Sequence, residues 1–196
     1  MKRNSFRAGS LLTGLFFAIP VMLWSGISRA GVEAILKGDA YTSTSAPGSN
    51  FGQNANLIVK DSVGGGGEGG SGKQKTFIKF DLSTLPGGIL VSEIDHVTLK
   101  LFINKVGSNG ILHICPAATD WNENSITNAT APLAGVPCAT PVTITSSDKN
   151  SYLAIDVTTM VEGWITTPST NRGIVLYADD GKLNVQFDSK ESDKTS

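Results

Sequence analysis

The stretch Lys75-Thr76-Phe77-Ile78-Lys79-Phe80-Asp81-Leu82-Ser83 predicts a β-strand with two unlike faces. Side chains alternate between the faces of a strand. One face carries Thr76, Ile78 and Phe80 and is apolar enough for a core. The other face carries Lys75, Phe77 and Lys79 and is expected to meet water. Two cations around an aromatic ring could hold an anionic polymer of ring-shaped units; the alternative is a half-buried strand whose lysines serve solubility.

The chain after residue 30 favours an all-β fold. Helical periodicity is scarce, and short alternating or apolar runs recur between clusters of Gly, Pro, Asn and Ser, which is typical of an antiparallel β-sandwich. The expected strands are Val32–Leu36, Ala40–Ser43, Ala55–Lys60, Thr76–Asp81, Ile94–Ile103, Ile111–Pro116, Val142–Thr145, Tyr152–Asp156, Gly173–Ala178 and Asn184–Ser189. One short helix is expected at Thr159–Trp164, with Asp156 or Thr158 as its cap.

Residues 1–30 have the features of a secretory signal peptide. Basic residues come first, an apolar run from Leu11 to Trp24 follows, and Ser28 and Ala30 have the spacing of a cleavage site. The run is short for a membrane span, although an uncleaved anchor is the alternative. We therefore expect a secreted, extracellular protein whose single domain covers residues 31–196, with no membrane segment after the signal is removed.

The charge of that domain argues against nucleic acid as a partner. The whole chain has 16 basic and 17 acidic residues, and residues 1–30 contain four of the basic ones and no acid. The mature domain is therefore left with 12 basic and 17 acidic residues, a net charge of −5. Any affinity for an anion must come from a local cluster of cations rather than from the overall charge.

The two cysteines, Cys115 and Cys138, are expected to form a disulfide, because the cysteines of an exported chain usually pair. Two buried free thiols are the alternative. Zinc is not expected, because no further cysteine or histidine pair flanks them. The polar end of the chain, residues 189–196, suggests that a last strand of the sandwich is missing.

Several short motifs follow one another along the domain. They are Asp39-Ala40-Tyr41, Pro47-Gly48-Ser49-Asn50-Phe51-Gly52, Leu57-Ile58-Val59, the stretch 75–83, Trp121-Asn122-Glu123-Asn124-Ser125-Ile126-Thr127, Ala131-Pro132, Ile155-Asp156-Val157-Thr158 with Val161 and Trp164, Asn171-Arg172-Gly173-Ile174-Val175-Leu176, and Phe187-Asp188-Ser189-Lys190-Glu191. In this order and spacing they resemble the DNRLRE-type domain, also classed as carbohydrate-binding module family 96 and related to the disaggregatase repeat.

The resemblance implies a β-sandwich of jelly-roll type on secreted or cell-surface proteins. Some members of the family bind acidic polysaccharides such as alginate, and the family supplies no catalytic residues to carry over. Lysine stands at 75, 79 and 190, where the family usually has arginine. A lysine is a point charge without the two-pronged fork of arginine, so weaker binding of carboxylates is expected.

Five residues are the expected ligand contacts: Lys75, Phe77, Lys79, Lys190 and Tyr41. The lysines would meet sugar carboxylates, and an aromatic ring would pack against a sugar ring. The alternative is that the lysines pair internally with Asp81, Asp188 or Glu191. A further aromatic residue, Phe51, is expected to plug the end of the sandwich.

No catalytic or metal site is expected, because neither His96 nor His113 belongs to a motif with a nucleophile or paired carboxylates. No cofactor is expected either, with calcium as the alternative. The loop acids considered for calcium are Asp39, Asp61, Asp156, Asp179 and Asp180. The sequence therefore predicts a noncatalytic module that binds an acidic polysaccharide. A structural or adhesion module of a cell-surface protein is the alternative, and the sequence leaves the oligomeric state open.

Overall fold

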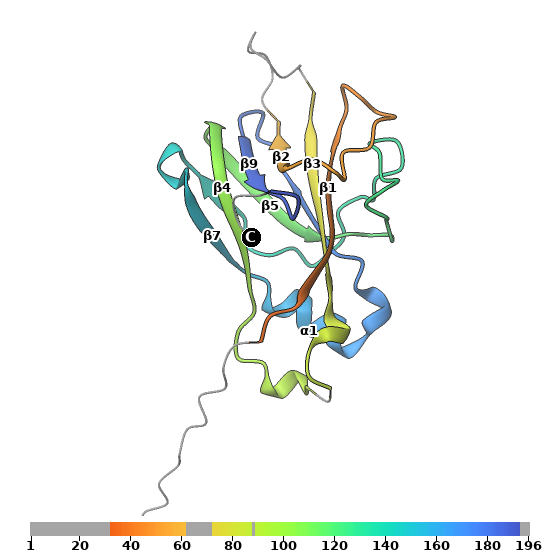
Figure 1. Ribbon diagram of the computed structural model, residues 1–196. Helices are drawn as coiled ribbons and strands as arrows, with labels where there is room; N and C mark the ends of the chain where they lie inside the picture. The colour runs from red at the N-terminus through yellow and green to blue at the C-terminus, as the bar shows by residue number, and fades with distance from the viewer. Residues whose placement is uncertain (1–31, 62–71, 88, 193–196) are drawn as a thin grey trace, which may run out of the picture. The chain divides into compact units, whose positions relative to one another are not determined.

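A computed structural model describes residues 32–61, 72–87 and 89–192 (Figure 1). The expected signal peptide at residues 1–30 and the expected loss of a strand after residue 192 lie outside these ranges, so both stay predictions. In the ranges described, no helix has the length and apolar character needed to cross a bilayer.

Strands dominate the described residues. They are β1 (Ile35–Ser43), β2 (Asn56–Lys60), β3 (Gln74–Asp81), β4 (Thr98–Ser108), β5 (Gly110–Pro116), β6 (Val142–Ile144), β7 (Ser151–Asp156), β8 (Ile174–Tyr177) and β9 (Asn184–Asp188). The helix is α1 (Thr158–Thr166), and short 3-10 turns are η1 (Leu82–Thr84), η2 (Val91–Glu93), η3 (Ser146–Asp148) and η4 (Pro168–Thr170).

The strands form one continuous antiparallel sheet that wraps around a common interior (Figure 1). The strand order is β6-β5-β8-β3-β2-β9-β4-β7, and β1 pairs with β3 beside this path. The predicted all-β, sandwich-like class with one short helix is confirmed, whereas the jelly-roll path stays a prediction.

Two strand predictions are wrong in their boundaries. The segments Val32–Leu36 and Ala40–Ser43 were expected to be separate strands, but one strand, β1, runs without a break from Ile35 to Ser43, and residues 32–34 lie outside it. Its pairing with β3 shifts register between Leu36 and Gly38, and such an irregularity lets a strand continue through residues that look like a break. Strand β4 begins at Thr98 rather than at Ile94.

The main core lies on the inner face of the sheet and follows the predicted alternation. On β4, the side chains of Leu99, Leu101 and Ile103 are buried, whereas Lys100 between them is exposed. Helix α1 packs Met160, Val161 and Trp164 against this core. The Asp156 carboxylate accepts a hydrogen bond of 2.9 Å from the Thr158 N–H, so it caps the first N–H of α1 from one position before the N-cap residue, Val157.

A second, smaller core lies on the outer face of β1, β3 and β8. It consists of Ala40, Phe77, Ala117, Trp121, Ile126 and Val175. Residues 117–141, which connect β5 to β6, supply its covering side chains. The predicted disulfide between Cys115 and Cys138 is confirmed, with an S–S distance of 2.02 Å, and it ties the end of this connection to β5.

Candidate functional site

The Trp121 side chain covers Phe77 on the outer face of β3. The rings of Phe77 and Trp121 have centroids 5.8 Å apart, and the Phe77 side chain has no exposed surface. The Trp121 indole N–H donates to the Arg172 carbonyl oxygen at 2.8 Å, which fixes the ring in place. The prediction that Phe77 faces water is therefore wrong, because a distant segment covers the strand face that points away from the main core.

Lys79 lies on one side of the Trp121 ring and is paired internally. Its ammonium forms an ion pair with Asp120 and lies 5.8 Å from the centroid of the Trp121 ring. The hydrogen bond from Lys79 is the main cause that holds the pKa of Asp120 below its ordinary value. The alternative of internal pairing thus applies to Lys79, although its partner, Asp120, is not one of the three acids considered in the sequence.

Lys190 is held by two carboxylates. Its Nζ lies 2.8 Å from Glu123 Oε2 and 3.0 Å from Glu191 Oε1. The hydrogen bond to Glu123, followed by that to Glu191, raises the pKa of Lys190 to about 12 against the opposing effect of burial. Glu191 was one of the partners considered in the sequence, whereas Glu123 was not.

Lys75 differs from the other two lysines. Its Nζ lies 5.7 Å from the centroid of the Tyr177 ring, and among the described residues no carboxylate lies within ion-pair distance of it. The His113 ring stacks on the Tyr177 ring with centroids 5.0 Å apart, and His113 Nε2 lies 2.9 Å from Asp179 Oδ1. The three predicted lysines therefore occupy three different environments instead of one groove.

Tyr41 lies on the opposite face of the sheet from these lysines. It pairs with Thr76 across β1 and β3, and directly paired residues of neighbouring strands point to the same side. Its side chain is 8% exposed, and its ring stacks on Phe51 with centroids 4.4 Å apart. Tyr41 and Phe51 thus cover one another, and the structure does not bring Tyr41 together with Lys75 or Lys79.

A cleft opens at the end of β3 beyond Lys79, and we call it the β3 cleft. Its volume is about 490 Å³. This size falls within the range of roughly 300 to 1,000 Å³ that is usual for ligand sites. The wall includes both charged and apolar groups, among them Lys37, Lys79, Phe80, Asp81, Trp164 and Asn171.

Lys37 lies in the wall of the β3 cleft but is not among the ligand contacts predicted from the sequence. It is exposed near the start of β1, and in the part of the chain described here no carboxylate forms an ion pair with it. The hydrogen bonds from Ser83 are the main cause that lowers the pKa of Asp81, and the positive charge of Lys37 adds a smaller effect in the same direction. The sequence did not predict this position, because the start of β1 is irregular and only its register with β3 shows that Lys37 lies beside the end of β3.

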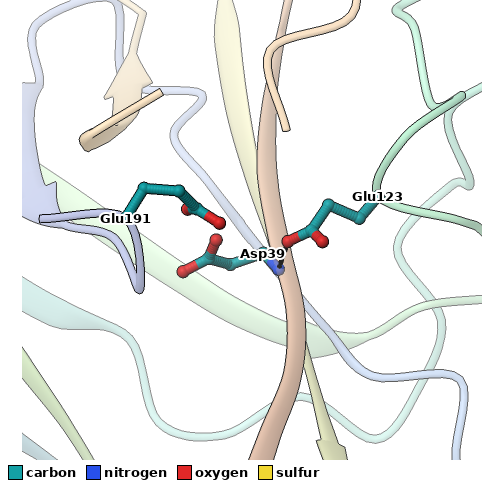
Figure 2. Close-up of side chains that lie close together, drawn as sticks. All are labelled: Asp39, Glu123 and Glu191. Atoms are coloured by element: carbon teal, nitrogen blue, oxygen red, sulfur yellow. Dashed lines mark hydrogen bonds between the residues drawn. The ribbon is translucent and has the colours of Figure 1, made fainter. Parts of the chain in front are cut away.

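A group of acids surrounds Lys190. One oxygen each from Asp39, Glu123 and Glu191 lies within 4.8 Å of the others, and Figure 2 shows the Asp39 and Glu191 carboxyl groups turned toward one another. The Asp39 N–H donates to Glu123 Oε1 at 2.8 Å, and the Lys190 N–H donates to Asp39 Oδ2 at 2.9 Å. Burial raises the pKa of Asp39 to about 7. The hydrogen bond from the Lys190 N–H opposes this rise, and the nearby Glu191 and Glu123 carboxylates add to it.

The other loop acids considered for calcium are engaged separately. Asp61 Oδ1 lies 2.6 Å from Lys73 Nζ, and Asp61 Oδ2 accepts from the Gly181 N–H. Asp156 caps α1, Asp179 contacts His113, and Asp180 accepts backbone N–H groups of its own turn. Asp39 is thus the acid of this set that joins other carboxylates.

The described residues thus form an all-β domain with a cleft of ligand size and two lysines on its wall. The chain belongs to carbohydrate-binding module family 96, whose family model matches residues 31–196. This confirms the resemblance drawn from the motifs, and the family implies a carbohydrate partner. A search of the curated proteins found no match.

Proposed function

We propose that the chain is a secreted, noncatalytic module that binds an acidic polysaccharide, and that the polymer lies in the β3 cleft. One observation carries the proposal: two lysines, Lys37 and Lys79, line the same cleft of a domain that belongs to a carbohydrate-binding family. An ammonium group without a partner is suited to a sugar carboxylate, because charge-assisted hydrogen bonds are stronger than neutral ones.

Lys37 makes the first contact in this scheme, since it has no ion pair to give up among the residues described. Lys79 contributes by exchanging its partner. Its present partner, Asp120, has a side chain that is 76% exposed. The Lys79 side chain is only 15% exposed, so its ammonium needs an anionic partner at all times, and a sugar carboxylate can take the place of Asp120 as the exposed Asp120 carboxylate turns into water. The half-buried Phe80 offers apolar surface for the face of a sugar ring.

The proposal predicts binding that weakens with salt, because the attraction is local and the domain as a whole is acidic. We expect retardation of the domain in native gels that contain alginate, and loss of retardation as sodium chloride rises to several times the physiological concentration. A neutral polymer such as a β-glucan should cause no retardation.

The decisive comparison uses three single lysine variants in the alginate gel. Lys37→Ala should abolish most of the retardation while leaving the melting temperature nearly unchanged, since the side chain is exposed. Lys100→Ala removes the same charge from an exposed position on β4 and serves as the control. Loss of retardation in Lys75→Ala but not in Lys37→Ala would move the site to the patch around Tyr177 and contradict the β3 cleft.

The second candidate is a structural or adhesion module without a sugar site. It is favoured by Lys79 and Lys190, whose ammonium groups already meet carboxylates of the chain itself. If this candidate is right, the domain binds no acidic or neutral polysaccharide at low salt, and all three lysine variants run like the unmodified protein.

A further inference from the structure

The acids around Lys190 leave two buried oxygens without a donor. Asp39 is 2% exposed, and among the described residues its Oδ1 has no hydrogen-bond partner. Glu191 Oε2 is likewise buried without a partner. These two carboxyl groups face one another in Figure 2. Buried carboxylate oxygens need a compensating positive group or proton, because an unpaired charge away from water is strongly unfavourable.

The net charge of the three acids and Lys190 also indicates that a positive group is needed at this place. Asp39, Glu123 and Glu191 carry three negative charges when ionised, and Lys190 neutralises one of them through Glu123 Oε2 and Glu191 Oε1. Lys190 also uses its backbone N–H for Asp39 Oδ2. Neither contact reaches Asp39 Oδ1 or Glu191 Oε2, so within the described part of the chain the three acids, when ionised, exceed this ammonium by two negative charges.

We propose that Asp39, Glu191 and Glu123 form a site for one calcium ion. One oxygen from each residue lies within 4.8 Å of the others. Calcium binds oxygen at about 2.3–2.6 Å, so ligands on opposite sides of the ion lie about 5 Å apart, and this group fits around one ion. Carboxylate oxygens are the ligands that this hard cation prefers, and calcium tolerates irregular geometry better than magnesium does.

The site joins three segments that are far apart in the sequence. Asp39 lies in β1, Glu123 in the connection that covers the outer face, and Glu191 just after β9. A calcium ion would therefore fasten the first strand of the domain to its last. Lys190 competes with the metal for Glu123 and Glu191, and the strength of binding depends on how far the ammonium can withdraw.

The test uses residues 31–196 after treatment with a chelator, and calcium chloride is the probe. Titration calorimetry at pH 8 should give one calcium per chain, with weaker or no binding of magnesium at equal ionic strength. Calcium at 100 times its dissociation constant should raise the melting temperature by about 5 °C. Asp39→Asn and Glu191→Gln should each reduce the affinity at least 10-fold, whereas Asp95→Asn, the same change at an exposed acid, should not alter it.

Lys190→Gln separates a metal site from a network of ion pairs. The substitution removes the competing ammonium, so calcium should bind more tightly and raise the melting temperature further than in the unmodified protein. If the acids only serve to hold Lys190, the variant is destabilised and calcium does not restore it. Absence of calcium binding to both the unmodified protein and Lys190→Gln would overturn the proposal and leave a proton shared between Asp39 and Glu191 as the compensation. These experiments measure calcium binding and melting temperature without alginate, so their outcome does not depend on whether the domain binds alginate.

Discussion

At Gly52, the backbone passes too close to Glu123 for any side chain. A Cβ at this position would lie 2.2 Å from the Glu123 carbonyl oxygen, and both segments are held there because Asn50 Nδ2 donates to the same oxygen at 2.7 Å. Glu123 cannot yield easily, since its side chain also accepts from the Asp39 N–H and binds Lys190. The glycine is therefore required by close approach rather than by an unusual backbone angle.

We predict that Gly52→Ala lowers the free energy of unfolding by about 1–3 kcal/mol, because the added methyl group forces the two segments apart. Gly48→Ala is the control four residues earlier, where a Cβ would meet nothing within 4 Å. Urea denaturation of both variants measures the difference. Equal stability of the two variants would show that the 117–141 connection is not held in place at Glu123.

Single residues of β3 show what the sequence reveals and what it hides. Alternation correctly places Thr76 and Ile78 on the inner face, where both are buried. Alternation also places Phe77 on the other face, but it says nothing about what lies above that face. Trp121, which covers Phe77, is 44 positions further along the chain. Asp120, the charge partner of Lys79, and Glu123, one of the two partners of Lys190, come from this same connection, so these two could not be predicted from neighbouring positions, whereas Glu191 could.

Among the elements, helix α1 shows how a short motif fixes a local structure. The Asp156 carboxylate accepts from both the N–H and the hydroxyl of Thr158, and the Thr158 hydroxyl oxygen accepts from the Val97 N–H at 2.9 Å. These bonds link the end of β7, the start of α1 and the segment before β4. The Thr158 hydrogen bonds are the main cause that lowers the pKa of Asp156 below its ordinary value of 3.8.

We predict that this cap stabilises the protein at neutral pH and fails in acid. Because the pKa of Asp156 is lower in the folded state than in the unfolded state, its contribution is fully present above the ordinary value and is lost as the pH falls through the folded value. The melting temperature of Asp156→Ala should therefore be lower than that of the unmodified protein at pH 7, and the gap should narrow near pH 3. A gap of equal size at both values would rule out the charged cap.

The boundaries of the elements were harder to predict than their existence. Strands β2, β5, β7, β8 and β9 agree with the predicted segments to within one residue, because turn residues flank each run. Strand β1 was divided wrongly, since only its pairing with β3 shows that the chain stays extended through Lys37 and Gly38. The same pairing brings Lys37 to the end of β3, so the error in the strand and the missed lysine have one cause.

For the molecule as a whole, the disulfide acts mainly on the unfolded chain. Cys115 and Cys138 are 23 positions apart, and a link over that distance restricts the unfolded ensemble. We predict that replacing both cysteines by alanine lowers the free energy of unfolding by about 3 kcal/mol, measured by urea denaturation.

Reduction of the unmodified protein with dithiothreitol is the matched control, because it opens the same link without removing side chains. Both treatments should shift the urea midpoint downward to a similar extent. An unchanged midpoint in the double variant would mean that the 117–141 connection is already ordered by Trp121 and Glu123 in the unfolded ensemble.

The position of β9 has a consequence for how the domain is made. This strand is the last one of the described chain to leave the ribosome, yet it lies between β2 and β4. Until Asn184–Asp188 has been synthesised, β2 and β4 present open edges that attract other strands. Pairings over such long sequence distances also form slowly. The nascent domain therefore stays vulnerable to aggregation until β9 has been synthesised, and a helper that shields the edges of β2 and β4 would have most effect before that moment.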